Sequence, residues 1–224
     1  MPELEQITTS DTSTSSTCEP TAEGNEILDF SRRKLTNAEL ISGIIARHPL
    51  AARQFHIRYS ARISRWVWRF MGTDSEHEDL VQQVLVQVLS SIHSLNKPDA
   101  LDSWIRCITV RVVRDELRKR KKKRFDLRNA LEIEDDVSVD PCSPWKQAHI
   151  KSFYNILDNL SPDDRIVFVL KHLEGYTNDQ IAEYCGYSIS TAKRRLERAR
   201  SRFLKDAMQD YMLMSLAGGD DDTR

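Results

Sequence analysis

The chain has 224 residues, of which 40% are hydrophobic, so it is long enough for one or two ordinary domains. Only seven residues are glycine and seven are proline, and the long periodic segments between them predict an all-α protein. No apolar run approaches the ~20 residues that a membrane-spanning helix needs, which argues against a membrane protein and for a cytoplasmic one. The formal net charge of −1 hides strongly basic and strongly acidic segments, and these carry more information than the average.

The N-terminal extension, residues 1–35, is rich in Ser, Thr and Glu. It has no apolar core of a signal peptide, and we expect it to be disordered. A first helical block follows over residues 36–124, with Thr36 placed to cap its first helix. A second helix is rich in aromatic residues and is expected to end at Gly72.

A third helix of this block, residues 75–94, has a polar face without net basic charge. Ser75 and Glu78 have the spacing of a capping box, which predicts the start of this helix. Its buried side is supplied by Leu80, Val84, Val88 and the neighbouring valines. Its polar side carries Asp79, Gln82, Gln83 and Gln87. A face of this kind favours a protein partner over nucleic acid.

The last helix of the first block opens at Trp104, after a loop over residues 94–102. The basic residues on the side opposite its apolar face are Arg111, Arg114, Arg118 and Lys121. Residues 111–124 hold nine positive and two negative side chains, more than the dipole of a helix would need at its C-terminus. A nuclear-localisation signal also fits the charge, but a basic face on an amphipathic helix favours contact with DNA.

An acidic, proline-containing segment, residues 125–145, separates this block from the next. Residues 125–147 hold six negative and two positive side chains. Such a segment cannot bury enough apolar surface to fold alone, so it is predicted to be a flexible linker. At the other end of the chain, residues 209–224 are expected to form a tail outside both blocks.

The second block, residues 146–208, is predicted to contain about four helices. Ser161 followed by proline is a strong start signal for one of them. Thr177 and Gln180 form a capping box that opens the next, and Gly186 supplies a turn that ends it. A short helix, a glycine turn and a further helix are the pattern of a helix-turn-helix.

The helix after this turn is capped by Ser188 and is strongly basic. One apolar seam along it is made by Ala192, Leu196, Ala199 and Phe203. Between Thr191 and Lys205 there are seven positive residues and one negative residue. A merely solvated face usually mixes charges of both signs, so the pattern favours a recognition helix that binds DNA.

Nothing in the sequence indicates catalysis, a metal or a cofactor. The cysteines are Cys18, Cys107, Cys142 and Cys185, and their spacing predicts unpaired thiols. Cys142 and His149, seven positions apart, are a weak candidate pair of metal ligands. A nucleic-acid enzyme would need a carboxylate cluster or a nucleophile with its base. The only candidates are Glu78–Asp79 and residues 134–136, and neither has a partner histidine or lysine at a suitable spacing.

Two stretches of the chain resemble a known family. "SEHEDLVQQVLVQVL" followed by "SWIRCITVRVVRDELRKRKKKR" resembles regions 2.2 to 2.4 of the extracytoplasmic-function (ECF) sigma factors of bacterial RNA polymerase, in the sigma-70 family. "LSPDDRIVFVLKHLEGYTNDQIAEYCGYSISTAKRRLERAR" is similar to their region 4. The resemblance covers roughly residues 40–207, with both domains in the expected order.

The resemblance implies three binding surfaces. The residues that match the segment docking on the clamp helices of the polymerase β′ subunit are Glu78, Asp79, Leu80, Gln82, Gln83 and Val84. The residues that match the helix meeting the −10 promoter element are Trp104, Arg111, Arg114, Asp115, Arg118 and Lys121. The residues that match the helix reading the −35 element are Ser188, Ser190, Thr191, Lys193, Arg194, Arg195 and Arg198. The loop over residues 94–102 would help to hold an unstacked base.

The implied protein is all-α, with two small helical domains joined by a flexible acidic linker and a helix-turn-helix in the second. It would bind RNA polymerase core, including the β subunit, and direct it to promoters, and an anti-sigma factor is a further candidate partner. The linker would thread toward the active-site cleft of the polymerase. Three positions depart from the family pattern: Arg111, commonly asparagine, Ala192, often valine, and Ile189, an apolar residue expected to face solvent or DNA. These departures affect the expected promoter sequence.

A different class of protein also fits part of the pattern. A transcription regulator with a helix-turn-helix could bind operator DNA without polymerase. Such a regulator would not need a polar, non-basic helix beside a DNA-facing one, and the first block has both. The sequence therefore favours the sigma factor.

Overall fold

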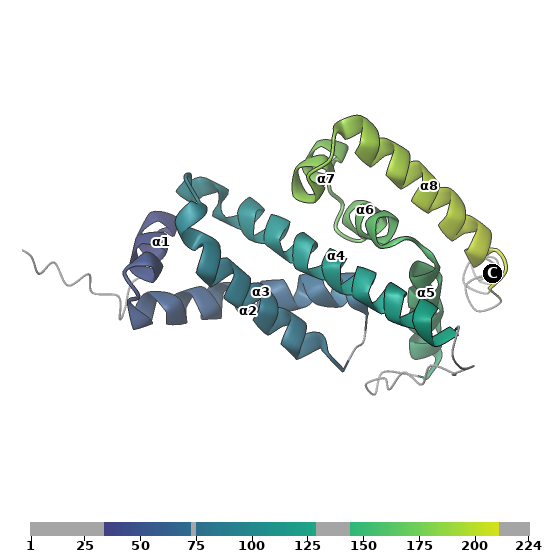
Figure 1. Ribbon diagram of the computed structural model, residues 1–224, viewed down its shortest axis with the longest axis horizontal. Helices are drawn as coiled ribbons and strands as arrows, with labels where there is room; N and C mark the ends of the chain where they lie inside the picture. The colour runs from purple at the N-terminus through teal and green to yellow at the C-terminus, as the bar shows by residue number, and fades with distance from the viewer. Residues whose placement is uncertain (1–33, 73–74, 129–143, 211–224) are drawn as a thin grey trace, which may run out of the picture.

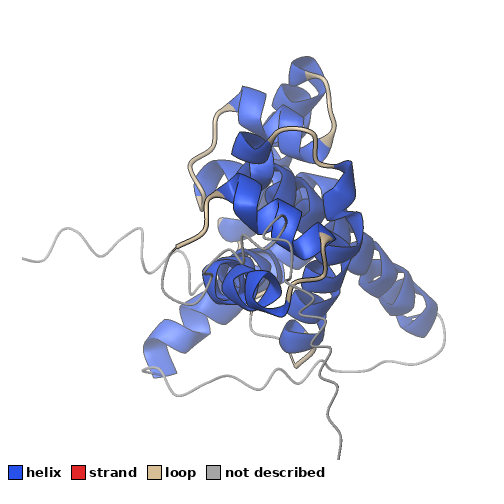
Figure 2. Cartoon of the chain, turned by 90° about the vertical axis from the view of Figure 1, so that its left-hand side faces the viewer, coloured by secondary structure: helices blue, strands red, loops and turns tan. Residues whose placement is uncertain are grey.

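The computed structural model describes residues 34–72, 75–128 and 144–210, and within these ranges the regular elements are all helices (Figure 1, Figure 2). The helices of the first block are α1 (Asn37–Ile45), α2 (Pro49–Met71), α3 (His77–Ser91) and α4 (Leu101–Arg128), with short 3-10 turns at Ile92–Ser94 and Pro98–Ala100. The helices of the second block are α5 (Pro144–Asn159), α6 (Pro162–His172), α7 (Asn178–Cys185) and α8 (Ile189–Ala207). The predicted all-α class is confirmed. No helix in the described ranges has an apolar stretch long enough to cross a membrane.

Several helix ends are fixed by the residues that the sequence marks. The Thr36 side chain accepts from the amide of Glu39, whose carboxylate accepts in turn from the amide of Thr36. Thr177 and Gln180 form the same reciprocal pair at the start of α7. Gly186 ends α7 with a φ of 70°, a left-handed conformation that strains any residue with a Cβ atom. These predicted signals are confirmed, because each depends on neighbours only a few residues away.

Two predicted helix starts are wrong. Ser75 does not form a capping box with Glu78, because α3 begins at His77 and its N-cap makes no side-chain hydrogen bond. Likewise, α4 begins at Leu101, because the preceding 3-10 turn runs directly into it. Trp104 therefore lies in the first turn of α4 and does not open it.

The core of the first block is built around α2. Its fully buried side chains recur every four residues, at Phe55, Tyr59, Ile63 and Val67. Helices α1, α3 and α4 pack on α2, and Val84 and Ile105 bring further fully buried side chains from α3 and α4. Each such side chain stabilises the fold by roughly 1.5–3 kcal/mol relative to an exposed one. This packing determines which faces of α3 and α4 point outward.

The core of the second block is centred on α6. Its buried residues run without interruption from Asp164 to Leu170, because α7 and α8 of its own block and α2 and α4 of the first block all pack on it. Phe168 of α6 stacks on Phe203 of α8, with ring centroids 4.5 Å apart. Ala192 and Ala199 are buried in the seam of α8. The helix-turn-helix of α7 and α8 is therefore held on α6 as the apolar seam predicts.

The two blocks lie directly against each other, with α6 and α7 packed along α4 (Figure 1). Arg165 of α6 is buried and donates to the carbonyl oxygens of Phe70 and Met71, at 2.8 and 3.2 Å. The last carbonyls of a helix have no partner within it, so Arg165 caps the end of α2. The ring of Tyr154 covers Gly72, where an added Cβ would come within 2.9 Å of it.

This contact between the blocks was not predicted from the sequence. Most of the predicted linker, residues 129–143, lies outside the described residues, as do residues 1–33 and 211–224. The beginning of the predicted linker continues α4 as far as Arg128, and its last two residues belong to α5. The described part of the chain therefore has a longer α4 and a longer α5 than the predicted limits.

Candidate nucleic-acid and polymerase interfaces

The outer face of α3 is polar and carries no basic side chain. The exposed members of the predicted set are Glu78, Asp79, Gln82 and Gln83. Leu80 and Val84 are only 4% and 0% exposed. These two side chains hold α3 on the core of its own block, so they can act on a partner only by positioning the exposed four.

Two apolar residues lie on the same outer face, where the sequence predicted only polar residues, so the predicted burial of all the neighbouring valines is wrong for Val86. Val86 is 64% exposed and Leu89 is 38% exposed. A signal for Val86 was present in the sequence. It lies two positions from both Val84 and Val88, which is the far side of a helix whose buried residues recur every four positions. The outer face of α3 thus combines acidic residues, glutamines and an apolar centre. This composition suits contact with another protein.

The outer face of α4 is basic, as predicted. Its exposed residues from the predicted set are Arg111, Asp115, Arg118 and Lys121. Arg114 is half-buried, and Trp104 is partly buried against the core of the first block. The ammonium group of Lys121 donates to the carbonyl oxygen of Leu160 at 3.3 Å. The C-terminal half of this face is therefore in contact with the second block.

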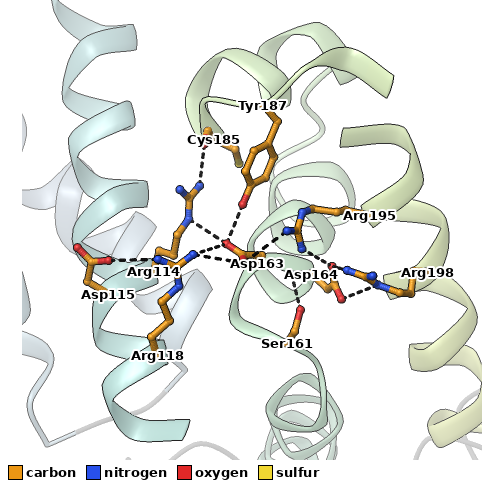
Figure 3. A network of polar contacts seen from close by, with 10 residues as sticks. All are labelled: Arg114, Asp115, Arg118, Ser161, Asp163, Asp164, Cys185, Tyr187, Arg195 and Arg198. Carbon is orange, nitrogen blue, oxygen red and sulfur yellow. Dashed lines mark hydrogen bonds and ion pairs between the residues drawn. The ribbon is translucent and has the colours of Figure 1, made fainter. Parts of the chain in front are cut away.

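Asp163, in the first turn of α6, is the point where α4, α8 and the turn between α7 and α8 meet (Figure 3). Its carboxylate pairs with Arg114 Nε at 3.3 Å and accepts from Arg118 Nη2 at 3.2 and 3.3 Å. The hydroxyl of Tyr187 donates to it at 2.7 Å, and Arg195 lies 3.7 Å away. Burial alone would raise the pKa of Asp163, but the Tyr187 hydrogen bond and the nearby arginines outweigh burial and lower it.

The neighbouring Asp164 holds the flank of the recognition helix (Figure 3). Arg198 donates to both of its oxygens, at 2.9 and 2.7 Å, and Arg195 donates to one of them at 3.2 Å. Burial opposes the ionisation of Asp164, yet the hydrogen bonds from Arg198 and from Ser161 at the helix cap lower its pKa. Arg195 and Arg198, both predicted to meet the −35 element, are thus tied to α6 in this structure.

The outermost side of α8 carries the remaining residues of the predicted set. Lys193, Arg194 and Ser190 are exposed, and no described side chain forms an ion pair with Lys193 or Arg194. The Ser188 hydroxyl accepts from the amide of Thr191 at 3.2 Å, so it caps the helix as predicted. Lys193 and Arg194 are therefore the cations of this set that the structure leaves open to a ligand.

Comparison with known proteins identifies the family of the chain. The family description "Sigma-70 region 2" matches residues 56–123, and "Sigma-70, region 4" matches residues 150–203. The RNA polymerase sigma factor SigV of Bacillus subtilis strain 168 is 30% identical over 137 residues, which are 60% of this chain and 78% of SigV. The chain belongs to the sigma-70 family of RNA polymerase sigma factors. The predicted resemblance is confirmed, and the sigma factor is supported over a regulator that binds operator DNA without polymerase.

Further relatives place this sigma factor in the ECF group. The ECF RNA polymerase sigma factor EcfG of Rhodopseudomonas palustris strain TIE-1 is 29% identical over 133 residues, which are 58% of this chain and 71% of EcfG. A solved structure of the sigma factor RpoE with the anti-sigma factor NepR from Bartonella quintana matches with a TM-score of 0.54 at 25% identity, covering 70% of this chain and 97% of RpoE. The structure of CnrH in complex with the cytosolic domain of CnrY shares the fold, with a TM-score of 0.53 at 20% identity over 78% of this chain and 98% of the matched one.

One arginine of the sigma factor lies in an aromatic cage that the sequence reasoning missed. The Arg106 guanidinium of α4 is 4.2 Å from the ring centroid of Trp66, 4.4 Å from Tyr176 and 5.3 Å from Tyr184. Glu174 lies 4.0 Å from Arg106 Nη1. Burial lowers the pKa of Arg106, and the charge of Glu174 opposes this effect. Trp66 belongs to the first block and both tyrosines to the second, so no short-range pattern could have revealed the cage.

The described cysteines of the sigma factor are free thiols. Cys107 is partly buried and Cys185 is buried, and burial raises the pKa of both thiols, that of Cys185 to about 11. Cys142, proposed with His149 as a weak pair of metal ligands, lies outside the described residues. Within the ranges that are described, no three histidine, cysteine or acidic side chains come together as a metal site.

Proposed function

We propose that this sigma factor binds polymerase core through the outer face of α3 and promoter DNA through α4 and α8. The observation that carries the assignment is the separation of charge between neighbouring helices of one rigid block. The exposed face of α3 has acids and glutamines but no cation, while the exposed face of α4 is rich in arginine and lysine. A polyanion is attracted to the second face and not to the first.

The domain limits follow from the same assignment. Residues 36–124 form the domain that binds core and the −10 element, and residues 146–208 form the domain that binds the −35 element. Residues 125–145 link them, and residues 1–35 and 209–224 are an extension and a tail. With this division each domain has one central helix, α2 or α6, and one DNA-facing helix, and a continuous hydrophobic core runs through both.

On α3, the contact with the clamp helices of the β′ subunit is centred on Val86. An exposed apolar residue surrounded by Asp79, Gln82 and Gln83 has the composition of an interface core with a polar rim. Burying an exposed valine against a partner contributes of the order of 1.5 kcal/mol or more. The four exposed polar residues then fix the orientation of the partner.

On the DNA side, the helices have different tasks. The exposed Arg111 and Lys121 of α4 meet the backbone near the −10 element together with Arg114 and Arg118, and the loop before α4 helps to hold an unstacked base. Arg194 lies on the side of α8 opposite its apolar seam, where it can enter a major groove. Arginine recognises a guanine edge with two hydrogen bonds, so Arg194 is the residue that reads a base.

The function needs no catalysis by the sigma factor itself. The relatives are named as RNA polymerase sigma factors, and the described residues contain no cluster of histidine, cysteine or acidic side chains that could hold a metal ion. We infer that the protein is not an enzyme and that it acts in the cytoplasm, where the polymerase and the promoters are. An anti-sigma partner is a further part of the proposal, supported by the similarity to the RpoE of the RpoE–NepR complex.

A pull-down with polymerase core tests the role of α3. The double variant Gln82→Arg/Val86→Arg places two positive charges on the proposed contact face, and we expect it to lose core binding by at least tenfold. The double variant His56→Arg/Ala61→Arg is the matched control, because it adds two positive charges at exposed positions of α2 in the same block. Equal core binding by both variants would contradict the assignment of α3.

A further inference from the structure

One flank of the recognition helix α8 is held by a buried carboxylate of α6 (Figure 3). Asp164 is 6% exposed, and its carboxylate accepts hydrogen bonds from Arg195 and Arg198, both of α8. A buried carboxylate is stable only when it has partners of this kind. This contact lies wholly within the second block and fixes α8 on α6.

The two arginines differ in how far they are open to solvent. The Arg195 side chain is 25% exposed, lies 3.7 Å from Asp163 as well, and has its guanidinium 5.1 Å from the ring centroid of Tyr187. The Arg198 side chain is 59% exposed, and its ion pair is with Asp164. Arg195 is thus enclosed by the protein, whereas Arg198 is held on one side and open on another.

Arg198 is held by one edge of its guanidinium. Its Nε donates to one oxygen of Asp164 at 2.9 Å, and its Nη2 donates to the other oxygen at 2.7 Å. A guanidinium carries five N–H groups in one rigid plane. The contact with Asp164 uses the edge between Nε and Nη2, so the edge between Nη1 and Nη2 keeps N–H groups for another acceptor.

The remaining edge of Arg198 matches the edge of a guanine. Guanine presents O6 and N7 side by side in the major groove, and two N–H groups of one guanidinium can bind both. Arg194 and Arg198 are four positions apart, so they lie on the same side of α8, about one turn from each other. Arg198 is therefore placed to read a second base pair, besides the one that Arg194 reads.

Holding one edge of the guanidinium also sets the direction of the other. A free arginine side chain has many rotamers, and it loses this freedom when it forms a bidentate contact. Arg194 has no ion pair with a described side chain and must be ordered by the DNA, whereas Asp164 has already ordered Arg198. A donor pair that is ordered in advance binds more readily and cannot turn toward a different base edge.

We propose that Asp164 is a positioning residue for promoter recognition, which orients Arg198 to read a guanine of the −35 element. The proposal rests on the proposed role of α8 at that element. Asp164 acts only through Arg198. Asparagine at this position could not accept both N–H groups, because its amide nitrogen is itself a donor, and Arg198 would lose its fixed direction.

The test measures the base preference of polymerase holoenzyme in transcription from a library with a randomised −35 element. We expect Asp164→Asn and Arg198→Lys each to lower the preference for guanine at the same position, by about five- to tenfold, as for the loss of a bidentate contact. Arg198→Lys keeps the charge and removes the planar fork. The double variant should lose no more preference than Arg198→Lys alone, because the two residues act as a unit.

Asp163→Asn is the matched control, because it makes the same change at the neighbouring position of α6, whose ion pairs are with other arginines. We expect it to keep the guanine preference. An equal loss of activity by Asp164→Asn on every upstream sequence would overturn the proposal, since a carboxylate that only stabilises the fold gives that result. A loss of the same preference by Asp163→Asn would overturn it too.

Base preference is a ratio of activities within one preparation, so partial unfolding lowers both activities and leaves the ratio unchanged. If Asp164→Asn forms no holoenzyme, Asp164→Glu decides, because it keeps both acceptor oxygens. It should retain the guanine preference that Arg198→Lys loses, and a loss in Asp164→Glu would count against the positioning role.

Arg194→Ala in the same library separates this proposal from the proposed function. If it changes the preference at its own base pair while Asp164→Asn and Arg198→Lys change none, the positioning role is wrong and α8 still reads the −35 element. If none of the three variants changes any preference, the proposed role of α8 is itself wrong.

Discussion

The basic faces of α4 and α8 look alike in the sequence, but the fold treats them differently. On α4, Arg114 and Arg118 are engaged by Asp163 of the other block. On α8, Lys193 and Arg194 are exposed and have no ion pair with any described side chain. A row of arginines at helical spacing therefore predicts a DNA surface, but it does not predict whether that surface is accessible.

The two faces also differ in which block holds them. The outermost side of α8 is exposed, whereas Arg114 and Arg118 of α4 are held by the second block. Arg195 and Arg198 are bound within their own block, to Asp164. The contact between the blocks therefore constrains the arginines of α4 more than those of α8.

The largest effect is expected where the blocks are joined by a buried charge. Arg165 is 3% exposed, pairs with Asp158 and caps the end of α2. Arg165→Met leaves a carboxylate without its buried partner and two helix carbonyls without donors. We expect the free energy of unfolding, measured by urea denaturation, to fall by about 3–5 kcal/mol.

Arg124→Met is the control for this change, because Arg124 pairs with the same Asp158 at 2.8 Å but is half exposed. An exposed pair contributes about 0–1 kcal/mol, so the control should lose no more than that. Equal losses of unfolding free energy in the two variants would show that one cation is enough for Asp158. They would also show that the hydrogen bonds from Arg165 to the end of α2 add nothing to the stability of the fold.

The sequence correctly predicted those features that depend on residues a few positions apart in the chain. The capping box of Thr177 and Gln180 and the glycine turn after α7 involve residues a few positions apart, and their geometry follows from local preferences. The buried and exposed sides of α3 follow from the helical period, although Val86 was overlooked. These features are decided before distant parts of the chain meet.

The ion pairs of Asp163 and Asp164 could not be predicted in this way. Asp163 and Asp164 were understood as acids that a helix dipole favours, which is correct for the first turn of α6. Their arginine partners on α4 and α8 lie 45 and 31 residues away along the chain. The role of the two carboxylates therefore depends on which helices pack together, and hydrophobic periodicity gives the faces of helices but not their neighbours.

An intermediate effect, on promoter discrimination, is expected from removing the exposed Arg194 of α8. Arg194→Ala should weaken transcription most at promoters with one particular upstream base, by the roughly 1–3 kcal/mol of discrimination that a bidentate contact supplies. Lys123→Ala, at an exposed position of α4, should instead lower binding nearly equally at all sequences and reduce the salt dependence by about one charge. Transcription from a library with a randomised −35 element separates the two. An equal loss for Arg194→Ala on every upstream sequence would mean that Arg194 contacts phosphate.

The smallest effect concerns stability at acid pH and tests whether Asp163 is ionised in its contact with α4. Burial opposes the charge of Asp163, but the hydrogen bond from Tyr187 and the charges of Arg118 and Arg195 lower its pKa below the ordinary 3.8. A carboxyl whose pKa is lower in the folded state stabilises the fold above its unfolded pKa, and this stabilisation is lost as the pH falls through the folded pKa. The difference in unfolding free energy between the unchanged chain and Asp163→Asn should therefore be constant from about pH 7 to about pH 5 and shrink below about pH 4. Arg118→Gln removes one of the cations that lower the folded pKa, so in that background the constant difference should be smaller and its loss should be complete at a higher pH. A difference that grows as the pH falls would mean that the protonated carboxyl is the favoured form, and α4 would then not be held by a charge.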